Sequence, residues 1–312
     1  MNIKQEIDEM FKSAIKKKVS DIFFIPSQKK VQILFKLINR RQNFKDLEES
    51  VAGGIINFLK FQSGMDISEK RRPQLGSYQY QGVNLRLSSV GNYLNQEILV
   101  IRLIYPNIEE QALPEKLTEL VDRKGLILFS GPMGSGKTSL MYRLAQLFLP
   151  SKTVMCIEDP TEIHVDGFLQ LQVNDEAKMS YEELIKTSLR QRPDILIVGE
   201  IRDQMTAQLV VKAALSGYTV LSTIHAKSKY SVIKRMIEFG VDEFSLKSVL
   251  NAAIYQRLIP SINQKLLCVI DILLDFDLPE KINELKDWQN KLKKYYERGV
   301  INHQVYQKYF YG

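Results

Sequence analysis

The segment GLILFSGPMGSGKTSLMYRLAQLF, which begins at Gly125, sets the tightest limit on how this chain can fold. A short apolar run from Leu126 to Phe129 predicts a buried strand, and the apolar spacing from Leu140 to Phe148 predicts a helix. Between them lies GPMGSGKT, which fits the pattern G-x-x-x-x-G-K-[ST] between a strand and a helix. The alternative interpretation is a glycine-rich turn before an ordinary helix. The pattern together with its flanks favours a phosphate-binding loop, and therefore nucleotide binding.

The loop has the residue types that hold a polyphosphate. Its glycines let the backbone bend tightly and turn N–H groups toward phosphate oxygens, and the helix that begins near Lys137 adds its positive end. Lys137 can reach the β- and γ-phosphates, and the Thr138 hydroxyl can ligate Mg²⁺. We therefore expect ATP and Mg²⁺ as ligands. The residues expected to bind the nucleotide are Gly131, Pro132, Met133, Gly134, Ser135, Gly136, Lys137, Thr138 and Ser139.

Composition is that of an ordinary globular protein, with 45% hydrophobic and 25% charged residues in 312, a length that suits two domains. No apolar run reaches the roughly 18 residues that cross a bilayer, and no signal-peptide pattern opens the chain. Cys156 and Cys268 form no C-x-x-C pair, so neither a disulfide framework nor a zinc site is indicated, and a reducing cytoplasm fits. The net charge of +7 is compatible with nucleic acid or an anionic membrane, although a modest excess more often reflects solubility.

Two domains joined by a linker are expected. Residues 1–105 predict a small α/β domain, with an amphipathic helix at the start and strands at 21–25, 31–38, 82–87 and 97–104. Residues 106–117 read PNIEEQALPEKL, which breaks periodicity and predicts the linker. From 118 to 275, strand-like runs alternate with helical patterns, which predicts a parallel sheet covered by helices. Residues 276–312 are charged and aromatic-rich and predict a helical end.

Polar residues follow four predicted strands of the second domain, and ligands collect at the carboxyl ends of parallel strands. The first group is the glycine-rich loop. The run TVMCI is followed by Glu158 and Asp159, the run DILIV by Gly-Glu200, and the run TVL by Ser-Thr-Ile-His225. Nucleotide hydrolysis needs one carboxylate to orient or deprotonate water, another to hold Mg²⁺ or its waters, and a group that senses the γ-phosphate.

Each of these residues also has an ordinary structural explanation. Acidic residues such as Glu158 and Asp159 favour turns, Glu200 is compatible with a solvated charge, and a single histidine more often makes a structural hydrogen bond. Their occurrence together on successive strands beside a phosphate-binding loop favours the catalytic interpretation.

Ordered motifs over nearly the whole chain resemble the ATPases of type IV pilus and type II secretion systems. IEDPTE resembles the family's Asp box, SLRQRPDILIVGEIRD its Walker B region, and GYTVLSTIHA its His box. GFLQLQVN and IYQRLIP match the nucleotide domain, and VSDIFFIP, VNLRLSS and EILVIRLI resemble the N-terminal domain. The resemblance implies an α/β fold with a PAS-like N-terminal domain and a RecA-like P-loop ATPase core.

Several features resemble the branch of this family that powers competence pseudopili for DNA uptake. They are the short N-terminus, the missing tetracysteine insert, the SDIFFIP start and the HAKS variant of the His box. The implied partners are further copies of the chain in a hexamer and a polytopic membrane platform protein, at the cytoplasmic face of the membrane. No direct nucleic-acid binding is expected.

The resemblance also implies roles for single residues. Glu158 would activate water and Glu200 would act at the Mg²⁺ shell, although these two roles could be exchanged, and His225 would face the γ-phosphate. Arg86 and Arg102 match N-terminal-domain arginines that reach the nucleotide; without the resemblance they are two exposed strand arginines.

Some positions depart from the family pattern. Phe23 stands where a histidine is usual, and Ala226-Lys227 stands where Thr-Asn commonly follows the His-box histidine. RRPQLGSY lacks the charged pair that usually follows its glutamine.

Two other functional classes stay open. One is a DNA-dependent motor of the RecA type, and the other is a nucleotide-gated scaffold with negligible turnover. A small GTPase is disfavoured because the chain lacks N-K-x-D.

Overall fold

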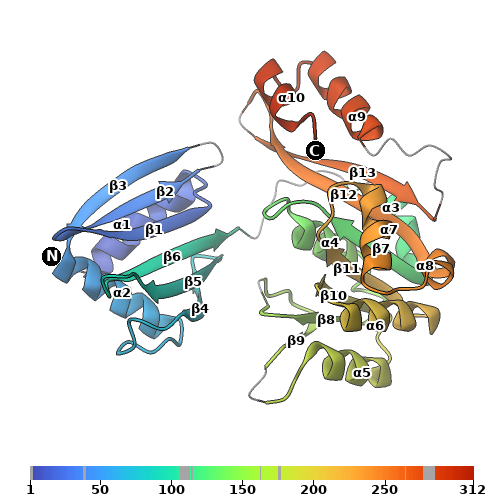
Figure 1. Ribbon diagram of the computed structural model, residues 1–312, viewed down its shortest axis with the longest axis horizontal. Coiled ribbons are helices and arrows are strands. Elements are labelled where there is room, and N and C mark those ends of the chain that lie inside the picture. The colour runs from blue at the N-terminus through green and yellow to red at the C-terminus, as the bar shows by residue number, and fades with distance from the viewer. Residues whose placement is uncertain are drawn as a thin grey trace. The chain divides into compact units, whose positions relative to one another are not determined.

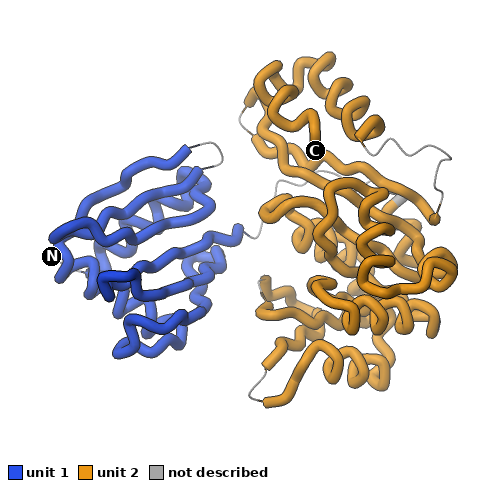
Figure 2. Tube along the Cα trace, in the orientation of Figure 1, with its two compact units in different colours: residues 1–107 blue, residues 108–312 orange. Residues whose placement is uncertain are grey.

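A computed structural model describes residues 3–37, 40–105, 113, 115–161, 163–174, 177–263, 265–276 and 285–312. The chain divides into two compact units, residues 1–107 and residues 108–312 (Figure 2). Most of the linker predicted at 106–117 lies outside the described residues, and its last part belongs to helix α3 (Glu115–Asp122). Its role as a linker stays a prediction.

The first unit is an antiparallel sheet with two helices. Helix α1 (Ile3–Lys16) precedes strands β1 (Asp21–Ser27), β2 (Lys30–Lys36) and β3 (Arg41–Glu48), and helix α2 (Glu49–Gln62) precedes β4 (Gln74–Tyr80), β5 (Val83–Gly91) and β6 (Glu97–Ile104). The strand order is β3-β2-β1-β6-β5-β4, with every neighbouring pair antiparallel. Both helices pack on one face, where alternate strand residues such as Ile22 and Phe24 are buried (Figure 1).

Sequence periodicity located only part of this unit. The predicted strands at 21–25, 31–38, 82–87 and 97–104 correspond to β1, β2, β5 and β6, although residue 38 lies outside the described part. Strands β3 and β4 were missed, because they form the two edges of the sheet and carry many polar, partly exposed residues. Helix α2 was missed as well; it contains the Gly53-Gly54 pair, which weakens a helical signal.

The second unit contains a seven-stranded sheet. After α3 come β7 (Gly125–Ser130), α4 (Lys137–Gln146), β8 (Val154–Glu158), β9 (Phe168–Gln172), α5 (Tyr181–Gln191), β10 (Ile195–Ile201), α6 (Gln204–Leu215) and β11 (Thr219–Ile224). Then follow α7 (Lys229–Glu238), α8 (Glu243–Val249), β12 (Leu250–Pro260) and β13 (Leu266–Leu274). The order is β13-β12-β7-β11-β10-β8-β9, and all pairs are parallel except β12–β13. The predicted mainly parallel sheet is confirmed.

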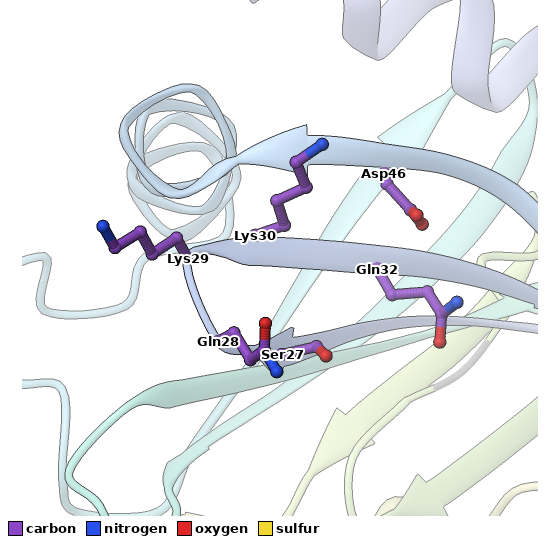
Figure 3. Close-up of a pocket in the computed structure, with 6 residues that line it drawn as sticks. All are labelled: Ser27, Gln28, Lys29, Lys30, Gln32 and Asp46. Carbon is purple, nitrogen blue, oxygen red and sulfur yellow. The ribbon is translucent and has the colours of Figure 1, made fainter.

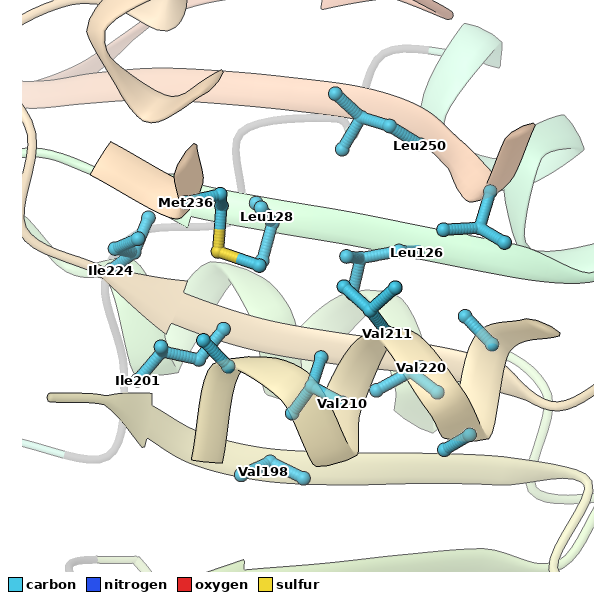
Figure 4. Close-up of a cluster of buried hydrophobic side chains, with 14 of the residues drawn as sticks. Leu126, Leu128, Val198, Ile201, Val210, Val211, Val220, Ile224, Met236 and Leu250 are labelled. Atoms are coloured by element: carbon cyan, nitrogen blue, oxygen red, sulfur yellow. The ribbon is translucent and has the colours of Figure 1, made fainter. Parts of the chain in front are cut away.

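Both faces of this sheet are covered, which explains why its central strands are continuous apolar runs. On β7, Leu126 and Leu128 join a core formed with α5 to α8 (Figure 4), whereas Ile127 and Phe129 join a second core with α3 and α4. Successive residues of a strand point to opposite faces, so the two cores hold β7 and β11 rigidly between them.

The chain ends in the predicted helical region, which packs on β12 and β13. Helices α9 (Lys286–Glu297) and α10 (His303–Tyr309) bury Trp288 against Tyr255, with ring centroids 5.2 Å apart. The Trp288 indole Nε1–H donates to the Tyr309 carbonyl at 2.8 Å. Lys229 of α7 forms ion pairs with Asp271 at 3.3 Å and with Asp287 of α9 at 2.7 Å, which attaches the end of the chain to the core.

Within the described part of the chain, every helix is too short or too polar to span a bilayer.

Candidate active site

The strand register brings the predicted site residues to one edge of the sheet. Ile224 of β11 pairs with Ser130 of β7, so His225 and Gly131 follow paired residues. Val198 of β10 pairs with Ser222 of β11 and with Ile157 of β8, so Gly199 and Glu158 likewise follow a paired level. Glu158 is the last residue of β8, and Glu200 lies within β10 at the irregularity between Val198 and Ile201. Both glutamates therefore reach the same end of the sheet as the glycine loop and His225, as expected for a site at the carboxyl ends of parallel strands.

The glycine loop has the shape of an anion cradle. Gly134 and Gly136 have φ of +74° and +83°, the left-handed region that glycine enters without a steric cost. The Lys137 ammonium group donates across the loop to the carbonyls of Gly131 at 3.0 Å and Pro132 at 3.2 Å. The loop thus holds a positive charge above its own backbone.

The helix that follows the loop begins without a side-chain cap. Gly136 is the N-cap of α4 and has no side chain to accept from the first N–H groups. The next four helices each begin with a capping side chain, namely Ser180, Asp203, Ser228 and Asp242. An uncapped helix start presents N–H groups and a positive dipole end, which suits a bound phosphate. The residues present therefore fit the nucleotide that the sequence predicts.

Gln256 of β12 stabilises the glycine loop by a hydrogen bond, a role that the sequence did not predict. Its fully buried amide Nε2 donates to the Ser135 carbonyl at 2.8 Å. A Cβ on Gly131 would lie 2.3 Å from the Gln256 carbonyl oxygen, so only glycine allows this approach. Among the described residues, neither Gln256 Oε1 nor the Ser135 hydroxyl finds a hydrogen-bond partner. The signal available in the sequence was a glutamine inside the apolar run IYQRLIP.

Glu200 and His225 are in contact. His225 Nε2 lies 2.9 Å from Glu200 Oε1, and Arg202 Nε lies 2.8 Å from the other carboxylate oxygen. The Glu200 side chain is 19% exposed, whereas those of His225 and Arg202 are about half exposed. Two neighbouring strands thus deliver one carboxylate between an imidazole and a guanidinium at the solvent boundary.

Glu158 has a different environment at the end of β8. It is 5% exposed, and its Oε2 accepts the Tyr142 hydroxyl at 2.5 Å. A Cβ on Gly199 would lie 3.1 Å from Glu158 Cγ, so the absence of a side chain at Gly199 leaves room for the carboxylate. This contact places Glu158 beside the backbone that leads into Glu200.

Tyr181, at the start of α5, has a hydroxyl whose pKa is affected by the charges of both carboxylates. Burial raises the pKa of its hydroxyl, and the negative charges of Asp159, Glu158 and Glu200 raise it further, while Arg202 acts in the opposite direction. A tyrosine that senses all of these charges lies among them. Sequence reasoning missed Tyr181 because an aromatic residue at a helix start carries no distinctive pattern.

Arg86 and Arg102 lie in the first unit, where the structure brings them together. They are direct partners on β5 and β6, on residues that alternate with the buried ones. Arg102 Nε lies 3.1 Å from Asp21 Oδ1. Burial opposes ionisation of Asp21, but hydrogen bonds from Arg102 and Ser20, with the positive charges of Arg102 and Lys36, together outweigh burial and lower the pKa of that carboxyl. Asp21, the acid of the SDIFFIP start, therefore orients Arg102.

A shallow depression of about 420 Å³ at the β1–β2 hairpin contains none of the predicted site residues (Figure 3). It is lined by Ser27, Gln28, Lys29, Lys30, Gln32 and Asp46.

Comparison with known proteins identifies the family. Residues 1–302 match the family described as type II/IV secretion system protein. The chain belongs to this family. It is a secretion ATPase, and ATP hydrolysis is its activity.

Relatives of this secretion ATPase include competence proteins. The competence protein ComGA of Streptococcus pneumoniae is 46% identical over 266 residues, which cover 82% of this chain and 84% of that protein. ComGA of Bacillus subtilis is 33% identical over 273 residues, covering 83% and 76%. Each retains more than two thirds of its own length in the match.

Solved structures agree with the fold. The Legionella pneumophila ATPase DotB superimposes with a TM-score of 0.77 at 19% identity, covering 97% of this chain and 94% of that chain. The pilus retraction motor PilT with bound ADP gives 0.72 at 22% identity, covering 96% and 95%. The predicted fold class is thereby confirmed.

Proposed function

We propose that this secretion ATPase powers assembly of a competence pseudopilus for DNA uptake from the cytoplasmic face of the membrane. Two of the relatives named above are competence proteins, and a further relative is named as the type IV pilus assembly ATPase PilB of Thermus thermophilus, 31% identical over 294 residues. The HAKS variant of the His box supports the same assignment.

The contact between His225 and Glu200, at the edge that also carries the glycine loop, is the observation that carries the catalytic part of this proposal. The loop N–H groups and Lys137 would bind the phosphates of ATP. Mg²⁺, which Thr138 and Glu200 would hold, would neutralise charge on those phosphates. Glu158 would orient and deprotonate the attacking water, and His225 would face the γ-phosphate.

The proposed assembly is a homohexamer that works with a polytopic membrane platform protein and does not bind nucleic acid directly. Arg86 and Arg102 would reach a nucleotide from the first unit, and arginines delivered to a transferring phosphate contribute about 10³ to 10⁵ in rate. The ion pair with Asp21 supports this role, because it holds one guanidinium in a fixed direction on an exposed strand face.

The first test is Lys137→Ala. Loss of the only ammonium group that crosses the described glycine loop should abolish ATP hydrolysis and pseudopilus assembly together. Lys212→Ala, an exposed lysine of α6, is the matched control and should retain both. Normal assembly by a Lys137→Ala protein without measurable hydrolysis would refute the motor function.

The second test separates binding from turnover. Glu158→Gln should retain ATP affinity, measured with a fluorescent analogue, and lose hydrolysis, because an amide cannot accept a proton from water. Equal loss of affinity and turnover would remove Glu158 from the role of general base.

The oligomer and the competing motor class need separate measurements. Mass in solution should increase toward a hexamer when a non-hydrolysable ATP analogue is added, and a monomer under both conditions would contradict the trans-acting arginines. Strong stimulation of hydrolysis by DNA would favour a DNA-dependent motor instead.

A further inference from the structure

Tyr142 lies on the helix that follows the glycine loop and contacts Glu158 at the end of β8. It lies in the second turn of α4, the helix that begins at Lys137, and is 2% exposed. Its hydroxyl donates to Glu158 Oε2 at 2.5 Å and lies 2.9 Å from Cys156 Sγ. A single side chain therefore connects the phosphate-binding helix to the carboxylate of the Asp box.

The groups around the Tyr142 hydroxyl keep their protons. Burial, and after it the charge of Glu158, raise the pKa of the Cys156 thiol well above its ordinary value, so the thiol keeps its proton. Burial likewise raises the pKa of Tyr142, with the neighbouring Cys156 and Glu158 adding to the effect. Both groups are therefore neutral donors near neutral pH. Tyr142 O–H donates to Glu158, and the Cys156 sulfur lies 2.9 Å from the same hydroxyl oxygen.

The Gln170 amide also faces the Tyr142 hydroxyl. Gln170 of β9 directs its amide Nε2 toward the Tyr142 oxygen at 3.4 Å, and the same amide donates to the Ile163 carbonyl at 2.8 Å. With this amide facing its oxygen, the Tyr142 hydroxyl has its hydrogen directed at the carboxylate. Such chains of hydrogen bonds strengthen one another in a buried setting.

Packing fixes the two partners in place. The Tyr142 ring meets Phe168 edge to face, with centroids 5.3 Å apart and an interplanar angle of 69°. Glu158 also lies close to Gly199, where an added Cβ would come within 3.1 Å of Glu158 Cγ. The carboxylate can therefore change its direction only by breaking the bond to Tyr142, which is costly because buried charged groups need their hydrogen bonds.

We propose that Tyr142 is a positioning residue that fixes the direction of the Glu158 carboxylate for activation of water. This role rests on the general-base function proposed for Glu158. Tyr142 lies five residues after Lys137 on the same helix, so its hydrogen bond ties the carboxylate to the helix that carries the phosphate-binding loop. Tyr142 does not touch the reacting atoms, and its effect is exerted through Glu158.

Tyr142→Phe removes the hydroxyl and retains the ring that packs on Phe168. We expect kcat to decrease about tenfold while KM for ATP and the affinity for a fluorescent ATP analogue change by less than about twofold. Tyr218→Phe is the matched control, because its partly buried hydroxyl also donates at 2.8 Å, to the Leu189 carbonyl, in the same unit. It should leave kcat unchanged, and melting temperatures of both variants establish that any loss of kcat is not a loss of folded protein.

The Glu158→Gln background separates positioning from a general structural effect. If Tyr142 acts through the carboxylate, Tyr142→Phe should cause no further decrease in the residual single-turnover rate of Glu158→Gln. The same tenfold decrease in both backgrounds, or a Tyr142→Phe enzyme with wild-type kcat, would overturn the proposal for Tyr142 alone. Wild-type turnover by Glu158→Gln itself would instead overturn the general-base function.

Discussion

The ends of β8 and β10 place the same residue type in two opposite environments. Glu158 is almost completely buried and accepts a hydrogen bond from the neutral Tyr142 hydroxyl. Glu200, on the neighbouring strand, lies between His225 and Arg202 at the solvent boundary. Environment rather than residue type sorts paired carboxylates into separate roles. The buried carboxylate suits proton transfer from water, and the one held by Arg202 and His225 suits the charged shell around phosphate and metal.

Neutralising Glu200 is the strongest test of whether the two carboxylates have separate roles. Glu200→Gln should lower kcat about 100-fold, because His225 and Arg202 lose the charge that holds them. It should also raise the Mg²⁺ concentration needed for half-maximal hydrolysis, whereas Glu158→Gln should not. Rates measured over a Mg²⁺ titration test this. A raised Mg²⁺ requirement only in Glu158→Gln would show that the two roles are exchanged.

Removing the imidazole tests the exposed side of the comparison alone. His225→Ala should lower kcat about tenfold or more with a smaller change in ATP affinity, because His225 is proposed to act on the γ-phosphate side. His164→Ala is the matched control, since His164 pairs with a single exposed acid, Asp166, at 3.2 Å. Steady-state rates of the two variants compare them directly, and equal activities would remove His225 from the site.

Gln256 supports the glycine loop at the end of β7 through a hydrogen bond to a backbone carbonyl. Gln256→Ala should raise KM for ATP about fivefold with a smaller effect on kcat, because the Ser135 carbonyl loses its buried donor and the loop loosens. Gln208→Ala serves as control, since Gln208 donates to a carbonyl at the exposed surface at 3.3 Å. A change in kcat without a change in KM would contradict a role in binding the phosphates.

The smallest expected effect concerns the Cys156 thiol, which lies in the buried network around Tyr142 and Glu158. Burial, then the charge of Glu158, raise the pKa of Cys156, and burial raises that of Cys268 to about 11. Because the thiolate is the reactive form, both should resist iodoacetamide at about pH 8 in the folded protein and react once it is unfolded. Reactivity of Cys268 should increase only as the pH approaches about 11. Fast labelling of Cys156 in the folded state would contradict the buried network.

Pattern reasoning worked where local sequence carries the constraint. Strands β7, β8, β10 and β11 are buried on both faces, so their continuous apolar runs predicted them from the sequence. The glycines of the loop are required by its backbone conformation. It failed at β3 and β4, whose exposed edge positions carry no apolar pattern. It also failed at Gln256 and Tyr142, which belong to the site only through contacts between segments far apart in the chain.

The sequence by itself determined the phosphate-binding loop, the parallel core, and the residues that follow its strands, because each depends on neighbours within a few positions. Only the tertiary structure decided which carboxylate is buried and which is held by His225 and Arg202. That outcome depends on the register of adjacent parallel strands and on the helix that packs over each end. Glu158 and Glu200 are the same residue type but have different environments in the folded protein. Tyr142 and Gly199 lie beside Glu158, whereas His225 and Arg202 lie beside Glu200.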